Sequence, residues 1–387
     1  MALIIGFTFY EMFVSWIVYG QKLIFQRGTK RQDRIYLFIA FTPLILLECL
    51  RRIDVGNDTY SYYSLFNYYN GLSGNFGIST ARRMWLEGIE PGYILLNKVV
   101  GYFTHNYQVF ISIIAIFSFF VVVRFIYKYS TNMALSSILF FLMFYGTYTN
   151  MLRQIIAMSF VLLAFDSLVN KNYFGFIVKV IIAMMFHRTA FIAFALIFFW
   201  KRKPSKFAIA IILIIMVGIG VLGRVSYVLG FLGITTTYTD IQAGASVNWN
   251  AIKNILLLIA VLFVKRDGWN FDENITSGEM IDGFKNLIDW TPVLCLAIAF
   301  IALGMPAAIR FDNYYSLFYI IEIPFLMSFA SDLDTNKVIV TGAILILLIT
   351  YTLGIHFFRL EWSTELNYHL YWQNQSAQIS GIDRTFR

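Results

Sequence analysis

Eight arginines lie on a face of the chain that carries few lysines, several of them within a turn of the end of an apolar segment: Arg51, Arg52, Arg82, Arg83, Arg153, Arg188, Arg224 and Arg310. A charge at such a position is costly unless it is paired or meets a water-filled cavity, so these arginines are functional candidates. A guanidinium group binds a carboxylate or a phosphate through two parallel hydrogen bonds. The sequence therefore indicates an anion-binding site on this face.

Acidic side chains accompany the arginines in two short motifs. In the first, Asp54 and Asp58 follow Arg52 through a turn that contains glycine and asparagine. These carboxylates either meet a substrate or pair with the arginines and cap a helix. In the second, Glu90 precedes Pro91, which restricts Glu90 to an extended or turn conformation. Glu90 is a candidate general base and a candidate ion-pair partner for one of the arginines.

The remaining candidates lie in two clusters at helix ends. Arg153 and Gln154 follow Asn150 at the start of an apolar segment, where backbone donors and the helix dipole favour an anion. His187 stands directly before Arg188 at the end of another segment. A lone histidine is usually a buried structural residue, so a structural and a catalytic role both stay open for His187. The second of these clusters also includes Arg310 with Tyr314 and Tyr315.

The composition requires that these clusters sit in a membrane protein. Of the 387 residues, 59% are hydrophobic and only 13% are charged, with a mean hydropathy of +0.67. A soluble protein of this length needs more polar surface. The net charge of +8 is explained by cytoplasmic loops and does not call for nucleic acid. No metal or nucleotide motif is present, Cys49 and Cys295 have no metal or redox spacing, and we expect no cofactor.

Apolar runs of this length form helices in lipid, so we expect an all-α polytopic fold with about twelve transmembrane helices, in a range of ten to fourteen. The segments are 3–25, 35–50, 107–127, 133–149, 154–169, 174–189, 190–200, 207–223, 250–264, 288–305, 313–330 and 338–356. The shorter stretch 93–104 is expected to be a re-entrant or interfacial helix. No cleavable signal peptide is expected, because the first apolar stretch lacks a basic region before it.

The lysine-rich connectors orient the helices by the positive-inside rule. They include Lys30, Lys128, Lys171 and the 201–206 cluster, and they indicate the cytoplasmic side. We therefore expect one integral membrane domain, 1–387, with its arginine-rich face in the periplasm. Its parts are a periplasmic loop with a short helix at 51–106, a periplasmic loop at 224–249, a cytoplasmic loop at 265–287 and a periplasmic C-terminal tail at 357–387.

The clusters recur in this order in one family. The chain resembles the EpsG-like polymerases, a branch of the Wzy-type O-antigen and exopolysaccharide polymerases, over roughly residues 45–330. The residues that carry the likeness are Arg52, Asp54, Asp58, Tyr60, the Glu90-Pro91 pair, Asn150, Arg153, Gln154, Ala157, His187, Thr189, Arg310, Tyr314 and Tyr315. The resemblance implies a GT-C-like fold in the bacterial inner membrane. It also implies an enzyme that joins undecaprenyl-pyrophosphate-linked oligosaccharide units at the periplasmic face, in exopolysaccharide or lipopolysaccharide synthesis.

If the resemblance holds, Arg153, Arg188 and Arg310 bind the donor pyrophosphate without a metal, with Arg52 as a fourth contact or on the acceptor side. His187, Glu90 or Asp58 accepts the proton of the attacking hydroxyl. The substrate-orienting residues are Asp54, Tyr60, Asn150, Gln154, Tyr314 and Tyr315. The 224–249 loop selects the repeat unit, and a separate chain-length regulator protein is a further expected partner.

Three other functions use a similar set of residues. A flippase or transporter for the same lipid also needs cations, although its charges would line a path through the mid-membrane. An O-antigen ligase would transfer finished polymer to a different acceptor. A non-enzymatic assembly subunit would tolerate loss of the arginines. The concentration of arginine on one face favours chemistry at that face.

Overall fold

The computed structural model of the chain is helical throughout the part that it describes, which comprises residues 2–20, 28–71, 88–221, 278–304, 308–329 and 368–372, with isolated positions between 254 and 258 and between 339 and 354. In those ranges one isolated β-bridge occurs and no strand is formed. The elements are α1 (Ala2–Tyr19), α2 (Lys30–Leu50), α3 (Thr59–Gly71), α5 (Pro91–Phe103), α6 (Tyr107–Tyr129), α7 (Met133–Asn150), α8 (Leu152–Val169), α9 (Tyr173–Phe186), the 3-10 helix η2 (Arg188–Ala195), α10 (Leu196–Lys201), α11 (Lys206–Val221), α14 (Gly278–Gly304), α15 (Ile309–Ser316) and α16 (Tyr319–Phe329).

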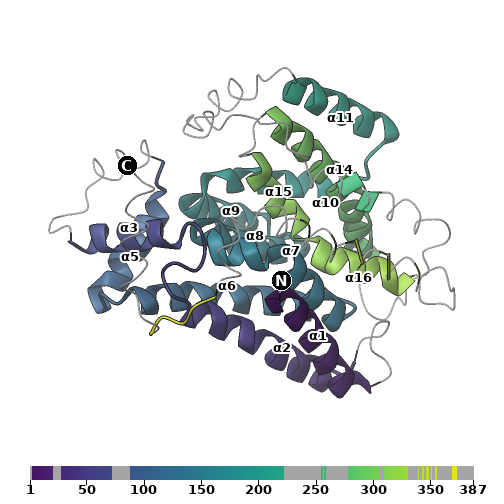
Figure 1. Cartoon of the computed structure of the whole chain (residues 1–387). Coiled ribbons are helices and arrows are strands. Elements are labelled where there is room, and N and C mark those ends of the chain that lie inside the picture. The colour runs from purple at the N-terminus through teal and green to yellow at the C-terminus, as the bar shows by residue number, and fades with distance from the viewer. Residues whose placement is uncertain are drawn as a thin grey trace.

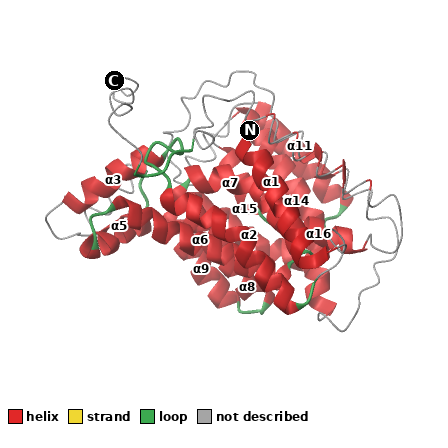
Figure 2. Cartoon of the chain, turned by 60° about the horizontal axis from the view of Figure 1, so that its bottom comes forward, coloured by secondary structure: helices red, strands yellow, loops and turns green. Residues whose placement is uncertain are grey.

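The long helices pack lengthwise in pairs. Helix α2 lies along α6, α8 lies along α9, and α11 lies along α14. Helices α3 and α5 lie together at one end, beyond the N-terminal end of α6 (Figures 1 and 2). The core between the helices is rich in aromatic rings, such as Phe119 against Phe140 and Tyr148. The outward surface of α1, α2 and α6 exposes large apolar side chains, among them Phe13, Phe38 and Phe120, which suits a surface that faces lipid.

The chain is therefore a helical membrane protein, as its composition predicts. Among the described residues, three helical segments are long and apolar enough to cross a membrane: Tyr107–Tyr129, Leu152–Val169 and Asp282–Ala302. The segment expected at 190–200 is the 3-10 helix η2 followed by the short α10. The segment expected at 313–330 is interrupted by a turn at Leu317 and Phe318, between α15 and α16.

Several predicted loops differ in detail from the structure. The short helix expected at 93–104 is present as α5, but the 51–106 region also contains α3, a second 13-residue helix. Helix α14 begins at Gly278, inside the predicted 265–287 loop. The 224–249 loop, Arg82, Arg83, Arg224 and most of the segments expected at 250–264 and 338–356 lie outside the described residues, as does the tail apart from 368–372.

The described helices have two chemically distinct ends. The site end is defined by residues 48–58, 88–90, 149–154 and 187–189, which contact one another across four connections. The lysine end is defined by Lys128, Asp166 and Lys201. There Lys128 binds Asp166, and Lys201 lies over the ring of Tyr173, which directly follows the α8–α9 connection. The grouping of the arginine motifs at one end agrees with the expectation from sequence.

Candidate functional site

The segment between α2 and α3 is anchored by a buried ion pair. Arg51, 1% exposed, lies 3.3 Å from Glu48 and also donates to the backbone oxygens of Val55 and Thr149. The backbone N–H of Asn57 donates to the side chain of Asn150 at 2.5 Å. These contacts fix the segment against the C-terminal end of α7 and so position Asp58, which immediately precedes α3.

Gly56 makes this close approach possible. Its φ of +94° lies in the left-handed region that favours glycine. A Cβ atom at this position would lie 2.9 Å from the backbone oxygen of Thr149 and 2.7 Å from the hydroxyl of Thr59. A larger residue would therefore push the segment away from α7 and displace Asp58.

Glu90 is held at the start of α5 by its neighbours in sequence. Pro91 occupies the first turn of the helix, and Glu90 is extended, with φ −76° and ψ 139°, as expected for a residue before proline. Gly92 packs closely against the end of α9: a Cβ atom at this position would lie only 2.7 Å from the backbone oxygen of Met185. This packing places the Glu90 carboxylate beside the connection between α9 and η2.

The buried Glu90 carboxylate binds three groups from two other elements. Its Oε2 accepts from Arg153 Nη1 at 2.7 Å, and its Oε1 lies 3.3 Å from His187 Nδ1 and accepts from the Arg188 backbone at 3.2 Å. The Arg188 side chain adds an ion-pair contact at 3.8 Å. Burial raises the pKa of Glu90, but the His187 hydrogen bond and the Arg153 charge outweigh burial and hold that pKa at about 2. Glu90 is thus an ionised anchor at neutral pH.

A cavity of about 200 Å³ lies next to this anchor. The charged and polar candidates that line it come from α3, α8, α15 and the connections beside them: Asp58, Arg153, Gln154, His187 and Arg310. All five were expected from the sequence, and they come together although they are spread over some two thirds of the chain. Two arginines in the lining of one cavity suit a ligand with several anionic oxygens.

Asp58 and His187 face this cavity with different electrostatics. Burial raises the pKa of Asp58 above its ordinary value, against the charges of Arg310 and Arg153. His187 contacts the ionised Glu90 through Nδ1, and a carboxylate can only accept, so Nδ1 carries the proton. In neutral imidazole Nε2 is then an acceptor. This buried Nε2 has no hydrogen-bond partner in the described part of the chain.

The other predicted residues surround the cavity without lining it. Arg52 forms a two-point ion pair with Asp54 at 2.5 and 2.6 Å, and Arg188 lies behind Glu90. Tyr60 lies against Tyr63. The Asn150 side chain accepts from the Asn57 backbone N–H and donates to the Gly146 backbone oxygen. The Tyr314 hydroxyl contacts Thr189, and the Tyr315 hydroxyl donates to the backbone oxygen of Ile192. The last two contacts dock α15, which carries Arg310, onto η2.

Four lining residues are not among the site residues that the sequence indicates: Ser61, Tyr62, Leu65 and Met151. Ser61, Tyr62 and Leu65 follow Asp58 at intervals of three, four and seven, so they share one face of α3. The sequence predicts loop for the run 59–71, because its tyrosines and asparagines weaken the apolar periodicity, so this shared face is not expected from the sequence. Within the described residues, no group of three or more histidine, cysteine, aspartate or glutamate side chains is placed to hold a metal ion.

Comparisons with known proteins agree with the sequence motifs. The family model described as "EpsG family" matches residues 34–370, which is most of the chain. The amylovoran biosynthesis protein AmsC of Erwinia amylovora is 23% identical over 252 residues, covering 61% of this chain and 66% of that protein. The chain thus spans just under two thirds of the length of this relative. No solved structure matches at a significant level.

Proposed function

Because the chain belongs to the EpsG family, we propose that it is a polysaccharide polymerase. It joins undecaprenyl-pyrophosphate-linked oligosaccharide repeat units at the periplasmic face of the bacterial inner membrane. The biosynthetic name of its Erwinia relative supports a role in polysaccharide assembly. A GT-C-like bundle of about twelve crossings is part of this proposal, with membrane lipid around it and a chain-length regulator protein as partner.

One observation carries the proposal. A single cavity combines two arginines, Arg153 and Arg310, with a histidine whose tautomer is set by a buried carboxylate. The arginines suit a pyrophosphate leaving group, because guanidinium forks neutralise the charge that develops on its oxygens. The histidine suits removal of a proton from a sugar hydroxyl. Glycosyl transfer from a lipid pyrophosphate requires both.

The proposed step is direct. The hydroxyl oxygen of the acceptor sugar forms a bond to the anomeric carbon of the donor, and the bond between that carbon and the pyrophosphate oxygen breaks. The electron pair of the broken bond stays on the undecaprenyl pyrophosphate, whose charge meets Arg153 and Arg310. The hydroxyl proton passes to His187 Nε2. The Glu90 carboxylate stabilises the resulting imidazolium through Nδ1. Of the candidate bases, His187 therefore takes the proton and Glu90 orients the His187 ring.

The remaining candidates receive supporting roles. Asp58 also lines the cavity and accepts a hydrogen bond from a second hydroxyl of the acceptor sugar. Arg188 helps to hold Glu90 in place and adds positive potential behind the pyrophosphate. Arg52, paired with Asp54, lies on the acceptor side, where Tyr60 offers an aromatic face.

Reconstitution tests the proposal. The protein is placed in proteoliposomes with the unpolymerised lipid-linked unit that accumulates in a deletion strain, and the products are resolved by length. Wild type should make glycans of many units. Arg153→Ala and Arg310→Ala should stay in the membrane and make none, whereas Arg124→Ala, an exposed arginine at the lysine end, should behave as wild type. Transfer of the unit across the bilayer without elongation would identify a flippase instead. Normal-length polymer from both cavity variants would refute the pyrophosphate assignment.

A further inference from the structure

Gln154 lines this cavity beside two arginines, and its side chain carries a buried hydrogen-bond acceptor. Its side chain is buried, at 2% exposed, and its Nε2 donates to the backbone oxygen of Arg310 at 2.6 Å. A backbone carbonyl can only accept, so this bond fixes which end of the amide is nitrogen. The other end, Oε1, is buried and has no hydrogen-bond partner in the described part of the protein.

An anionic group cannot satisfy this oxygen. A pyrophosphate diester has oxygen atoms that only accept hydrogen bonds, and Gln154 Oε1 also only accepts. The same is true of His187 Nε2, a second buried acceptor without a partner in the described residues, on a residue that lines the cavity. Buried polar groups in proteins find partners, so both acceptors call for a ligand that donates. Sugar hydroxyls and acetamido N–H groups are such donors.

The size of the cavity bears on which part of a lipid-linked donor can lie next to Gln154. A cavity of about 200 Å³ admits a group of the size of a sugar ring. The sugar next to the reacting bond is the part of the donor that enters this cavity, because the pyrophosphate attached to it meets Arg153 and Arg310. The rest of the repeat unit has to extend beyond this cavity.

We infer that Gln154 recognises a hydroxyl or amide N–H of the donor sugar attached directly to the pyrophosphate, in an inference that rests on the proposed polymerase function. Gln154 is then a specificity residue, and the cavity is a one-sugar subsite. Its bond to the Arg310 backbone couples sugar recognition to the helix that carries a pyrophosphate-binding arginine.

Two lipid probes that carry the same pyrophosphate diester test this inference. One is the unpolymerised lipid-linked unit from a deletion strain, and the other is the methyl diester of undecaprenyl pyrophosphate, which has no sugar. Affinities are measured for the protein in nanodiscs. Wild type should bind the sugar-bearing lipid more tightly by about tenfold or more, since each 1.4 kcal/mol is a factor of ten. This comparison needs no variant, and equal affinities would overturn the inference.

The Gln154→Met variant distinguishes recognition of the donor sugar by Gln154 from structural support of Arg310. It should remove the preference for the sugar-bearing lipid and leave the affinity for the methyl diester within about threefold of wild type. Gln108→Met is the matched control, because Gln108 also donates from Nε2 to a backbone oxygen, that of Arg51, but does not line the cavity. That variant should keep the preference. Equal weakening of both lipids in Gln154→Met would overturn the inference, since Gln154 would then only support Arg310. Failure of wild type to bind either lipid would instead refute the proposed function.

Discussion

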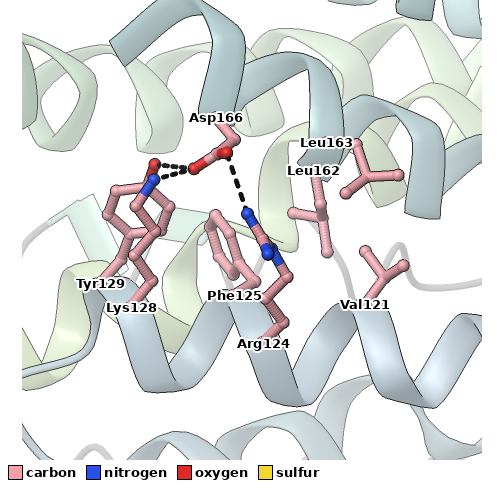
Figure 3. A pocket seen from close by; sticks show the side chains of 8 residues that line it. All are labelled: Val121, Arg124, Phe125, Lys128, Tyr129, Leu162, Leu163 and Asp166. Atoms are coloured by element: carbon pink, nitrogen blue, oxygen red, sulfur yellow. Dashed lines mark hydrogen bonds and ion pairs between the residues drawn. The ribbon is translucent and has the colours of Figure 1, made fainter. Parts of the chain in front are cut away.

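Two carboxylates at opposite ends of α8 have nearly the same chemical surroundings. At the site end, Glu90 contacts Arg153 from the first turn of α8, together with Arg188 and His187. At the lysine end, Asp166 from the last turn of α8 contacts Lys128, Arg124 and Tyr129 of α6 (Figure 3). Each carboxylate thus meets two formal positive charges and one further polar ring.

The two clusters differ in burial and in empty space. Glu90 is 2% exposed and lies beside a cavity of about 200 Å³, whereas Asp166 is 22% exposed and the space beside it is about 10 Å³, enough for one water molecule. Both oxygens of Asp166 meet partners on α6, which closes the cluster (Figure 3). At the site end, two acceptors on the cavity wall are without partners in the described residues. Of the two clusters, the one at Glu90 borders both unfilled volume and unused hydrogen-bonding capacity, and this combination indicates a site.

The largest expected difference follows from one matched pair of substitutions. Glu90→Gln keeps the shape of the side chain but removes the charge that holds Arg153 and sets the tautomer of His187. We expect a loss of polymerisation of about a thousandfold or more, since a misplaced base and a misplaced charge act together. Asp166→Asn makes the same chemical change at the lysine end and should leave the rate within about twofold. The measurement is polymer formed per minute in proteoliposomes; similar losses in both variants would remove the distinction between the two clusters.

A smaller effect is expected from the ring that accompanies each carboxylate. His187→Gln removes the proposed base and should lower the rate by about a hundredfold to a thousandfold while changing affinity for the lipid-linked unit little. Added imidazole should restore part of this activity. Tyr129→Phe removes the matching polar group beside Asp166 and should have no effect on rate. A change in affinity alone for His187→Gln would assign the histidine to binding.

Acid should reveal the stabilising role of Glu90. Its pKa is about 2 in the folded protein and ordinarily about 4.5, so its ionised form stabilises the fold above about pH 5. This contribution, about 3 kcal/mol by linkage, is lost as the pH falls from about 5 to about 2. The difference in Tm between wild type and Glu90→Gln should therefore narrow between pH 7 and pH 3. A gap that stays constant would show that Glu90 acts through shape and not through charge.

Much of this comparison could be predicted from the sequence. Proline after Glu90 fixes its backbone, and the alternation of apolar segments assigns Arg153, His187 and Arg310 to one end. These residues include arginines on the face where the positive-inside rule expects few positive charges, and this indicates a site. The ion-pair role of Glu90 with an arginine was one of two interpretations that the sequence left open, and the structure has that pair.

Other features depend on contacts that no local pattern contains. The sequence leaves open whether Asp54 pairs with an arginine or meets a substrate; the structure has the Arg52–Asp54 pair outside the cavity lining, in a turn that contacts Asn150. Helix α3 was missed because its tyrosines and asparagines suppress the apolar periodicity. The C-terminal segment 368–372 had no predicted role, yet it pairs with the end of α2 across more than 300 residues of sequence.

The smallest expected effect concerns this C-terminal segment and asks how far the site end extends. Tyr368 donates from its hydroxyl to the backbone oxygen of Leu47, in the last turn of α2, at 2.5 Å, and Arg52 N–H donates to the backbone oxygen of His369. Carbonyls in the last turn of a helix have no partner within that helix, so the tail caps α2. Tyr368→Phe should lower stability by about 1 kcal/mol, measured by denaturant titration in detergent, and should slow polymerisation no more than about twofold. Tyr371→Phe keeps the backbone pairing and is the control, because Tyr371 contributes its backbone N–H to Leu50. A loss of rate in Tyr368→Phe much larger than twofold, with stability unchanged, would contradict a purely structural cap. The C-terminal segment would then control the position of Asp58 through the 51–58 segment.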